Sequence, residues 1–454
     1  MQYVSLRQIL EARDTRVSLQ QKLIKQYHKT LICFTMNIPG PIKTSPAIER
    51  AFCTGCTLLN KRFVPEAILH REISFHCTGC QALYVIALDA ISVKQICVDI
   101  EDNSPLGRLF DMDVLTPDGH KLCRNDIDKP ERSCMICGIS GKGCASRRIH
   151  SVTDLQSATQ QIIDSHFAKS DAEQIASLAV RSLLDEARTT PKPGLVDKNN
   201  QGSHHDMTLS TFEASALSLY PHFTHCVEIG QLTAHSSYQT TFSKLQQEGI
   251  AAEQSMYRTT NGVNTHKGAI YIIGILCGAL GRLWNADHPI PPIDKLLDIC
   301  SLLTQDAVKE AFSKMEHLVD PCTHGEQIYL SYGLTGIRGE VASGLSTVRN
   351  IGLPNYINAL ERGLSPNDAG SITLLHLISN THDTNLYHRG GIAGYQFAST
   401  SAQKLLKEFP FPSADQIKLL DDKFIANNLS PGGCADLLSA TYFLHALSNN
   451  FHHY

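Results

Sequence analysis

The sequence predicts two domains of different fold class: an N-terminal α/β or α+β domain with a mixed sheet, and a C-terminal all-α domain. The chain has 454 residues, which is too long for one ordinary hydrophobic core. Strand-like and helix-like segments alternate up to about residue 170. From Asp171 to the end, almost every segment with apolar periodicity is helix-like.

Composition narrows the class of protein. Hydrophobic residues make up 42% of the chain and charged residues 19%, which is typical of a soluble globular protein. The formal net charge is -4, so the chain has no excess of basic residues that would favour binding to nucleic acid. The most apolar run, Ala269 to Leu280, is too short to span a membrane, and the N-terminus has no signal-peptide core. We therefore expect a cytoplasmic protein without nucleic-acid or membrane partners.

The expected elements of the first half follow from local patterns. A helix, a strand and a rigid Gly-Pro turn that ends on Lys43 are followed by a second helix and further strands. The expected ranges are a helix over Ser5–Lys29, a strand over Leu31–Asn37, the turn Gly40–Lys43, and strands near Ile73–His76, Ala82–Ala87 and Gln95–Ile100.

Two aspartates provide the chemical focus of this half. On a strand, Asp111 and Asp113 point to one face while the bulky apolar residues around them point to the other. Two like charges this close are unfavourable without a cation, and carboxylates suit Mg²⁺ together with substrate phosphates. Arg108 and Lys43 would then bind phosphate. The alternative is a solvated edge strand with two surface aspartates.

The fifteen cysteines are more typical of thiols or metal ligands than of disulfides, because no secretion signal is present. Two sets have spacings that suit zinc, and either set could instead be buried free thiols. The first set is Cys53, Cys56, Cys77 and Cys80, and the second is Cys134, Cys137 and Cys144, followed by Arg147, Arg148 and His150.

The motifs of the first half resemble a known family. The stretches Gly40–Lys43, Gly107–Pro117, Arg132-x-Cys134-x-x-Cys137 and Cys144-Ala145 are similar to the apo-citrate lyase phosphoribosyl-dephospho-CoA transferases, over roughly residues 1–170. The resemblance implies a nucleotidyltransferase-like domain. Such an enzyme attaches the prosthetic group of citrate lyase to a serine of the acyl-carrier (gamma) subunit and releases pyrophosphate. The first cysteine set is not a hallmark of that family.

The second half is expected to be a succession of helices after a lapse in the pattern near 168–171. The expected helices are Ala172–Arg188, Thr208–Cys226, Thr233–Glu248, Gly268–Leu283, Ile293–Ala311, Val341–Ile351, Tyr356–Gly363, Asn367–Asn380, Tyr395–Lys407, Ala414–Asn427 and Cys434–Ser448.

Five polar, Gly-rich loops interrupt these helices, and most of them lead into a helix. Unpaired N–H groups at a helix N-terminus, with glycines beside them, suit phosphate. Such loops could surround one polyphosphate with Mg²⁺, although each loop alone is also ordinary helix punctuation. The loops are Thr190–Met207, Gly262–Gly268, Gly333–Glu340, His382–Gly391 and Leu429–Asp436.

These loops resemble the triphosphoribosyl-dephospho-CoA synthase family, from about Asp171 to the end and in order. The resemblance implies an all-helical enzyme that joins ATP to 3′-dephospho-CoA: the 2′-hydroxyl attacks the ribose C1′ of ATP and adenine leaves. By role, the implied residues are Asp197, Glu340 and Asp383 for catalysis, Asp206 and Asp436 for Mg²⁺, and Lys192, Gly194, Asn264, His266, Lys267, Arg338, Arg389, Gly390, Gly391, Gly432 and Gly433 for phosphate or nucleotide.

The main hypothesis is therefore a fused bifunctional enzyme, with domains over 1–170 and 171–454. One alternative is a nucleotidyltransferase joined to a helical metal-dependent phosphohydrolase, based on the doublets His205-Asp206 and His382-Asp383. Another is a zinc-ribbon interaction module based on the cysteine pairs.

Overall fold

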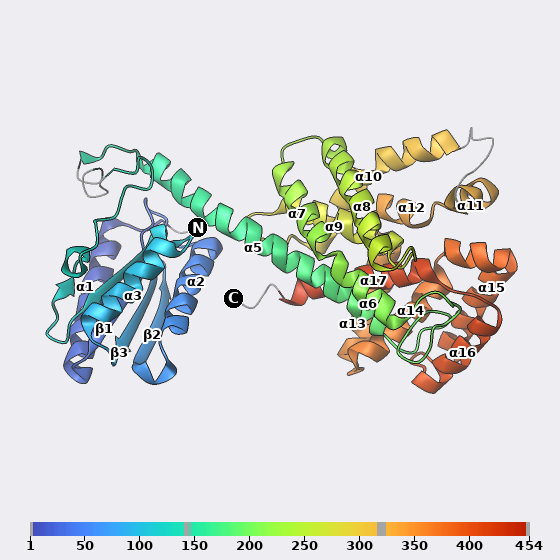
Figure 1. Ribbon diagram of the computed structural model, residues 1–454, viewed down its shortest axis with the longest axis horizontal. Helices are drawn as coiled ribbons and strands as arrows, with labels where there is room; N and C mark the ends of the chain where they lie inside the picture. The colour runs from blue at the N-terminus through green and yellow to red at the C-terminus, as the bar shows by residue number, and fades with distance from the viewer. Residues whose placement is uncertain (1–2, 140–143, 145–146, 316–323, 451–454) are drawn as a thin grey trace. The chain divides into compact units, whose positions relative to one another are not determined.

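A computed structural model of the chain describes residues 3–139, 144, 147–315 and 324–450 (Figure 1). It contains two compact units. The first comprises Met1–Lys169 together with Asn285–His288, and the second comprises Ser170–Trp284 and Pro289–His453. None of the described helices is long and apolar enough to cross a bilayer.

In its described part, the first unit combines three helices and the first part of a fourth, α5 (Val152–Arg188), with a five-stranded sheet. Side chains of Ser5, Ser45 and Asp89 cap the three helices by accepting a hydrogen bond from the third helical N–H. The elements are α1 Leu6–Tyr27, β1 Thr30–Met36, α2 Pro46–Arg62, η1 Pro65–Ala67, β2 Ile68–His76, β3 Gly79–Ile86, α3 Ala90–Asn103, η2 Gly107–Leu109, β4 Phe110–Leu115, β5 Lys121–Leu122 and η3 Arg124–Ile127.

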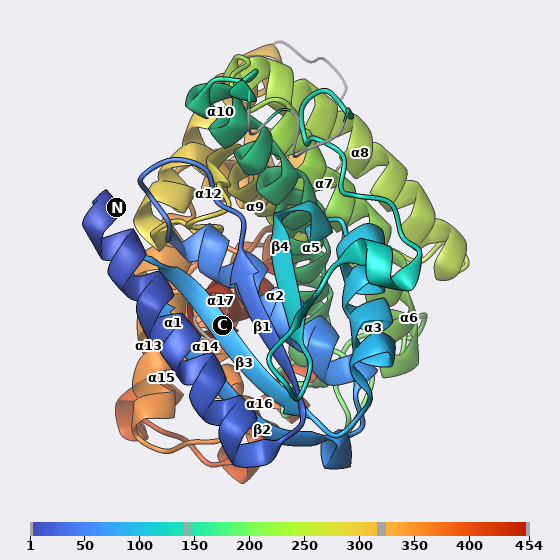
Figure 2. The same ribbon diagram turned by 90° about the vertical axis from the view of Figure 1, so that its left-hand side faces the viewer.

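The strand order is β2-β3-β1-β4-β5, and each described pair is antiparallel. The prediction of a mixed sheet is therefore wrong, and the α+β alternative is the observed class. Helix α1 packs on one face of the sheet, where Leu23 contacts Leu31 and Cys33 of β1 (Figure 2). On the other face, Phe52 of α2 stacks on Phe34 of β1 at 4.9 Å between ring centroids.

The strand predicted over Gln95–Ile100 is instead part of α3. Its buried residues Val93, Cys97 and Ile100 are spaced four and three apart, which is the period of a helix with one apolar face. The side chain of Asp89 fixes the start of this helix.

The second unit is helical throughout its described part. Helix α9 packs against α7, α8, α10 and α17 and is the core of the unit. Its elements are the end of α5 (Val152–Arg188), α6 Leu209–Ser218, α7 Tyr220–Leu232, α8 Tyr238–Thr259, α9 Lys267–Leu283, α10 Ile293–Met315, α11 His324–Tyr332, α12 Gly336–Ala342, η4 Val348–Gly352, α13 Leu353–Glu361, α14 Pro366–Asn380, α15 Thr384–Glu408, α16 Ala414–Ala426 and α17 Gly432–Asn450.

Several details differ from the sequence-based expectations. The helix expected over Val341–Ile351 is interrupted, because α12 ends at Ala342 and Leu345 adopts a φ of 53° before η4 begins at Val348. The loop expected over Gly333–Glu340 is helical from Gly336. The lapse expected near 168–171 is absent, because Asp171 lies inside α5 and accepts a hydrogen bond from Trp284 Nε1 at 2.9 Å. The helix expected over Thr208–Cys226 divides at Leu219, just before Pro221, whose ring nitrogen cannot donate to the preceding turn. The loop expected over His382–Gly391 is helical from Thr384.

Candidate functional site

The acidic pair of the first unit lies on β4, as predicted. Exposure alternates along this strand: Phe110, Met112 and Val114 are buried, and the two aspartates between them are not. Register with β1 places Asp111 beside Thr35 and Asp113 beside Cys33, on the face that carries α1. The strand geometry predicted from the sequence is therefore confirmed.

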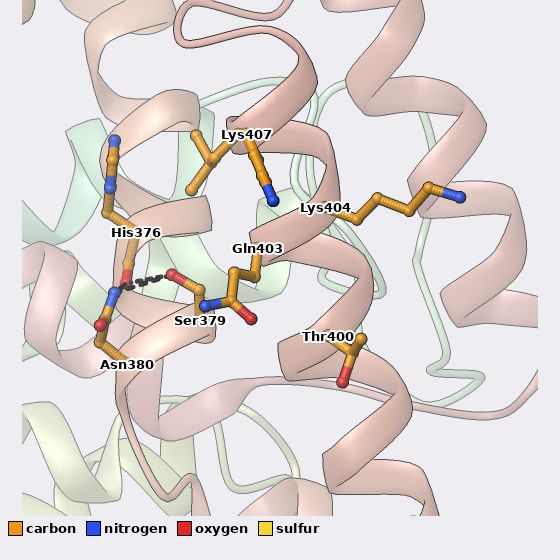
Figure 3. A pocket seen from close by; sticks show the side chains of 8 residues that line it. His376, Ser379, Asn380, Thr400, Gln403, Lys404 and Lys407 are labelled. Carbon is orange, nitrogen blue, oxygen red and sulfur yellow. Dashed lines mark hydrogen bonds between the residues drawn. The ribbon is translucent and has the colours of Figure 1, made fainter.

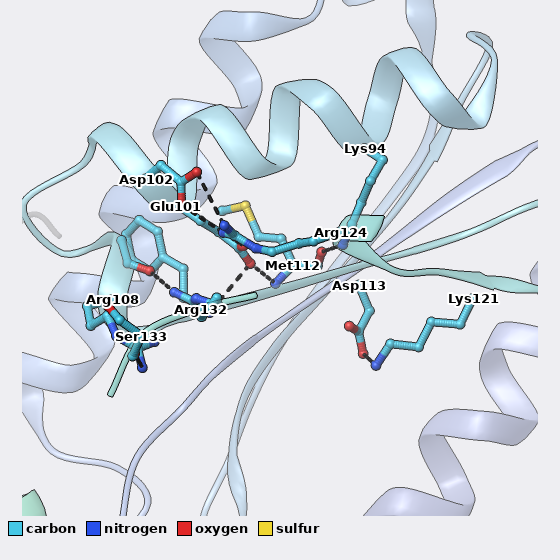
Figure 4. A network of polar contacts seen from close by, with 12 residues as sticks. Lys94, Glu101, Asp102, Arg108, Met112, Asp113, Lys121, Arg124, Arg132 and Ser133 are labelled. Carbon is cyan, nitrogen blue, oxygen red and sulfur yellow. Dashed lines mark hydrogen bonds and ion pairs between the residues drawn. The ribbon is translucent and has the colours of Figure 1, made fainter. Parts of the chain in front are cut away.

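The electrostatics of this pair suit a cation. Partial desolvation, followed by the negative charge of Asp113, raises the pKa of Asp111. Asp111 accepts no hydrogen bond from any described residue, whereas Asp113 Oδ2 lies 2.5 Å from Lys121 Nζ across the β4–β5 hairpin (Figure 4). Two adjacent carboxylates, one of them without a protein donor, fit Mg²⁺ with phosphate oxygens as its remaining ligands.

A buried ionic network holds the other face of β4 (Figure 4). Glu101 is 7% exposed and accepts hydrogen bonds from the Met112 N–H at 2.9 Å and from Arg124 Nη2 at 2.8 Å. Arg132 Nη1 lies 3.7 Å from Glu101 and donates to the Phe110 carbonyl at 2.6 Å. The carboxylate of Glu101 therefore fixes both the strand and two arginines.

The two predicted phosphate-binding motifs of this unit are adjacent. The Asn37 N–H donates to the Leu109 carbonyl at 2.7 Å, so the turn that leads to Lys43 leaves the sheet beside Gly107–Leu109. A Cβ at Gly107 would lie 2.2 Å from the Glu101 carbonyl oxygen, so only glycine fits at this position. The position of the turn is thus set by backbone contacts.

The cations of these motifs are partly engaged by carbonyl groups. Arg108 Nη2 donates to the Ser133 carbonyl, while its buried Nε has no partner among the described residues. Lys43 Nζ donates to the Ile38 carbonyl at 2.5 Å. Burial lowers the pKa of both cations, which indicates that each would gain from a bound anion.

The two cysteine sets differ in geometry. In the described ranges, one group offers three or more metal donors within 4.8 Å of one another: Cys134, Cys137, Cys144 and His150. The first set forms no such group. Its Cys53 and Cys56 lie on α2, and burial raises the pKa of the Cys56 and Cys80 thiols to about 12, as expected of buried free thiols.

In the second unit, the loop after α5 folds around a buried ion pair. Lys192 is 2% exposed, and its Nζ lies 2.6 Å from Glu186 Oε1. Asp197 closes the loop by accepting from the Lys192 N–H at 3.1 Å and the Asn199 N–H at 2.6 Å. Both predicted site residues therefore shape the loop in this structure.

Helices α15 and α16 and the loop before α17 are hydrogen-bonded to this loop. The Gly194 N–H donates to Asp421 Oδ1 at 2.8 Å, and Ser203 Oγ donates to the Leu429 carbonyl at 2.7 Å. Arg389 Nη1 donates to the Ser203 carbonyl at 2.8 Å. Segments more than 180 residues apart are thus joined by direct hydrogen bonds.

Asp383 joins the N-termini of α15 and α17. Its carboxylate accepts from the Asn385 N–H at 2.8 Å and from the Cys434 N–H at 2.8 Å. Gly432 faces the Asn385 side chain and Gly433 faces the Asp383 carboxylate, where an added Cβ would lie 2.6 Å and 3.1 Å away. Burial raises the pKa of Asp383, and the backbone donors oppose that shift.

Asp436 lies against the start of α9. A Cβ at Gly268 would lie 1.9 Å from Asp436 Oδ2, so this close approach requires glycine. Burial, followed by the charges of Glu186 and Asp383, raises the pKa of Asp436 well above its usual value. Acidic groups from α5, α15 and α17 therefore lie close enough to repel one another.

His266 completes this buried cluster. Its Nδ1 lies 2.8 Å from Ser215 Oγ, and its buried Nε2 has no hydrogen-bond partner in the described part of the chain. Burial, followed by the charge of Lys192, lowers the pKa of His266 to about 3. The imidazole is therefore neutral and has one free buried nitrogen for a ligand.

A cavity of about 610 Å³ is lined by residues of α7–α10 and by Arg338 of α12. The wall carries the cations Lys267, Lys314 and Arg338 and the acids Glu253 and Glu310, and its other residues are mostly apolar. Lys267 Nζ lies 3.0 Å from Glu253. The buried hydroxyl of Tyr271 has no partner among the described residues, so the cavity offers both charge and an unused polar atom.

The remaining predicted residues have separate positions. Glu340 accepts from the Thr347 N–H at 2.7 Å, and burial raises its pKa. Asn264 Oδ1 accepts from the Lys267 N–H at 3.2 Å at the start of α9, and Asp206 is exposed. Gly390 and Gly391 follow Arg389 in α15, where Gly391, with φ 61°, interrupts the helix.

A second cavity, of about 680 Å³, lies between α14 and α15 (Figure 3). Lys404, Lys407 and His376 are among its lining residues, and it contains none of the predicted site residues.

Several residues that contribute to the two sites were not predicted from the sequence. The Pro-Asp-Gly turn before Lys121 is a hairpin signal that could have placed this lysine across from Asp113. Glu186, Asp421 and Tyr271 lie inside helices whose sequences carry no local signal of these contacts. Their roles depend on packing between distant segments.

Comparison with known proteins agrees with these two regions. Residues 4–166 match the family described as apo-citrate lyase phosphoribosyl-dephospho-CoA transferase, and residues 172–453 match ATP:dephospho-CoA triphosphoribosyl transferase. Protein CitXG of Haemophilus influenzae is 37% identical, covering 98% of this chain and 97% of its own length. Protein CitXG of Leuconostoc mesenteroides subsp. cremoris is 33% identical, with 97% of each chain covered.

A relative of the second region alone is the 2-(5′′-triphosphoribosyl)-3′-dephosphocoenzyme-A synthase of Haemophilus ducreyi, which is 40% identical over 69% of this chain and 99% of its own. The fold and the two sets of motifs define a two-part transferase. The chain belongs to the family of fused proteins in which the transferase region precedes the synthase region. The resemblance predicted from the motifs is confirmed.

Proposed function

We propose that this protein makes triphosphoribosyl-dephospho-CoA from ATP and 3′-dephospho-CoA and transfers phosphoribosyl-dephospho-CoA to the acyl-carrier subunit of citrate lyase. The observation that carries the proposal is that both family profiles match in order, over 4–166 and 172–453. We assign transfer to a domain over 1–170 and synthesis to a domain over 171–454. Both substrates and the abundant thiols suit the cytoplasm.

In synthesis, the 2′-hydroxyl oxygen of dephospho-CoA forms a bond to C1′ of the ATP ribose and loses its proton. The bond from C1′ to adenine breaks, and the departing adenine gains a proton. The ribosyl centre acquires positive charge, which carboxylates stabilise. Asp383 and Asp436 are buried carboxylates of this region, and because burial raises the pKa of both, a bound cation is needed to keep them ionised. Mg²⁺ held at Asp436 would supply that cation and would also neutralise the triphosphate, and the exposed Asp206 is a separate candidate ligand.

The cation-lined cavity supports this assignment. Lys267 and Arg338 can bind phosphate oxygens, while the apolar wall suits an adenine ring or a pantetheine chain. The Tyr271 hydroxyl in the lining of this cavity is a buried polar atom that a ligand would satisfy. Lys192 stays in its ion pair with Glu186 and holds the loop in place.

In transfer, the serine hydroxyl oxygen of the carrier attacks the phosphorus nearest the ribose, and pyrophosphate leaves. Asp111 and Asp113 would hold Mg²⁺, which offsets the charge that builds on the leaving group. Lys121, Arg108 and Lys43 are the cations available to the phosphates. The serine proton passes to a carboxylate or to solvent.

The rival phosphohydrolase hypothesis required the His-Asp doublets to bind metal. That hypothesis predicts release of phosphate and no adenine. The test is to incubate the full chain with ATP, dephospho-CoA, Mg²⁺ and apo-carrier. We expect free adenine, pyrophosphate and a carrier with increased mass. ADP or phosphate without adenine would overturn the proposal.

A further inference from the structure

We infer that Cys134, Cys137, Cys144 and His150 bind one zinc ion, which fixes the segment between η3 and α5. Neither the transferase assignment nor the relatives' names include such a site. The argument depends on four donors that converge from a span of seventeen residues.

The donor geometry suits tetrahedral zinc. Cys137 Sγ lies 3.4 Å from Cys144 Sγ and 3.3 Å from His150 Nε2, and all four donor atoms lie within 4.8 Å of one another. Bonds of about 2.3 Å to sulfur and about 2.0 Å to nitrogen place tetrahedral ligands roughly 3.5–3.8 Å apart. Three cysteines and one histidine are a common ligand set of structural zinc sites.

The backbone is shaped to present the sulfur atoms. The Cys134 N–H donates to the Ile139 carbonyl at 2.6 Å, and the Gly138 N–H donates back to the Cys134 carbonyl at 3.1 Å. This turn brings the Ile136 N–H to 3.5 Å from Cys134 Sγ. An N–H group aimed at sulfur stabilises a thiolate, which is the form that binds zinc.

The burial of the donor residues distinguishes this cluster from an exposed, redox-active cysteine pair. Cys134 and Cys144 are buried and His150 is half-buried, so solvent reaches mainly Cys137. A disulfide between Cys137 and Cys144 would use two of the four donors and would not explain why Cys134 and His150 lie in the same cluster. Zinc uses all four donors.

The site is tied to the acidic pair through Arg132. This arginine, two residues before Cys134, donates to the Gly107 carbonyl at 2.5 Å and to the Phe110 carbonyl at 2.6 Å. The neighbouring Ser133 carbonyl accepts from Arg108. A zinc ion bound by Cys134 would therefore help to hold Arg132 and Arg108 against the backbone just before β4.

The test is the zinc content of the purified full-length chain, measured by mass spectrometry of the metal. We expect one zinc per chain, loss of most of it in Cys137→Ser, and retention in Cys53→Ser, whose cysteine lies in α2 and belongs to the other set. Absence of zinc from the wild type, or equal zinc in Cys137→Ser, would overturn the inference.

A second measurement guards against misfolding of the variant. Cobalt added to the zinc-free wild type should give the absorption of tetrahedral thiolate coordination, and His150→Ala should weaken and alter that spectrum. A Cys137–Cys144 disulfide in protein purified without oxidant would contradict the site. If transfer proceeds as proposed, zinc removal should slow carrier labelling at least tenfold while adenine release is unchanged; failure of that arm alone would revise the role of the zinc and leave the metal site in place.

Discussion

The two candidate sites are built in opposite ways. In the first unit, Asp111 and Asp113 lie two residues apart on one strand, with Lys121 on the adjoining strand. In the second unit, Lys192 is 2% exposed and pairs with Glu186 of the preceding helix α5, while Asp436 of α17 lies against Gly268 in the first turn of α9. The first site depends on local strand geometry, whereas the second depends on the whole helical core.

This difference predicts that loss of charge affects chemistry in the first unit and stability in the second. The largest effect is expected for Asp111→Asn combined with Asp113→Asn. Both side chains keep their size but can no longer hold Mg²⁺, so carrier labelling should fall by more than about 10³-fold. Adenine release should be unchanged. Labelling by mass spectrometry of the carrier checks this, and persistent labelling would disprove the role of the pair.

The next effect is on stability. Lys192→Met leaves Glu186 buried without its partner, which should lower the free energy of unfolding by about 3–5 kcal/mol. Urea unfolding followed by the fluorescence of Trp284, the single tryptophan, reports on the second unit.

The matched control is Lys267→Met, because Lys267 forms an exposed ion pair with Glu253. Its loss should lower stability by less than about 1 kcal/mol. Equal effects of the two substitutions would show that burial of the Lys192 pair is not what distinguishes this site.

A pH series sharpens the comparison further. The folded pKa of His266 is about 3, below the usual value near 6.5, so the unfolded state binds the proton more readily between those values. His266 therefore costs stability as pH falls from 6.5 towards 3. His266→Gln should remove this part of the slope, about 1.4 kcal/mol per pH unit. An unchanged slope, measured by Trp284 fluorescence, would mean that His266 protonates freely in the folded state.

The smallest expected effect concerns binding. Arg338→Ala removes a cation from the cavity that is lined by α7–α10 and Arg338. KM for ATP in adenine release should then rise about tenfold. Lys404→Ala, in the cavity between α14 and α15, is the control and should leave KM unchanged. If Lys404→Ala raises KM instead, ATP binds at the other cavity.

A site built on one strand can be predicted from the sequence more fully than a site built by the packing of distant segments. The period of two around Asp111 fixed the face of both aspartates, because a strand has no other way to place them. The strand prediction over Gln95–Ile100 is wrong because the apolar residues Val93, Cys97 and Ile100 follow the period of a helix. The role of Asp421 in holding Gly194 could not be predicted, because 227 residues separate them and only packing brings them together.

Motif order identified the family of both halves, yet it did not assign individual roles. The sequence predicts catalytic roles for Asp197 and Asp383. In the structure, their carboxylates accept hydrogen bonds from backbone N–H groups. Their catalytic roles stay predictions. For the cysteines, spacing alone suited both sets, and only the spatial convergence of His150 with the second set separated them.

The most direct test of two independent sites in one chain is adenine release with and without dephospho-CoA, in the wild type and in the Asp111→Asn, Asp113→Asn variant. With ATP and Mg²⁺ present, the account predicts adenine at the same rate from both proteins, and none when dephospho-CoA is omitted. Adenine that forms without dephospho-CoA, or that disappears in the variant, would contradict it.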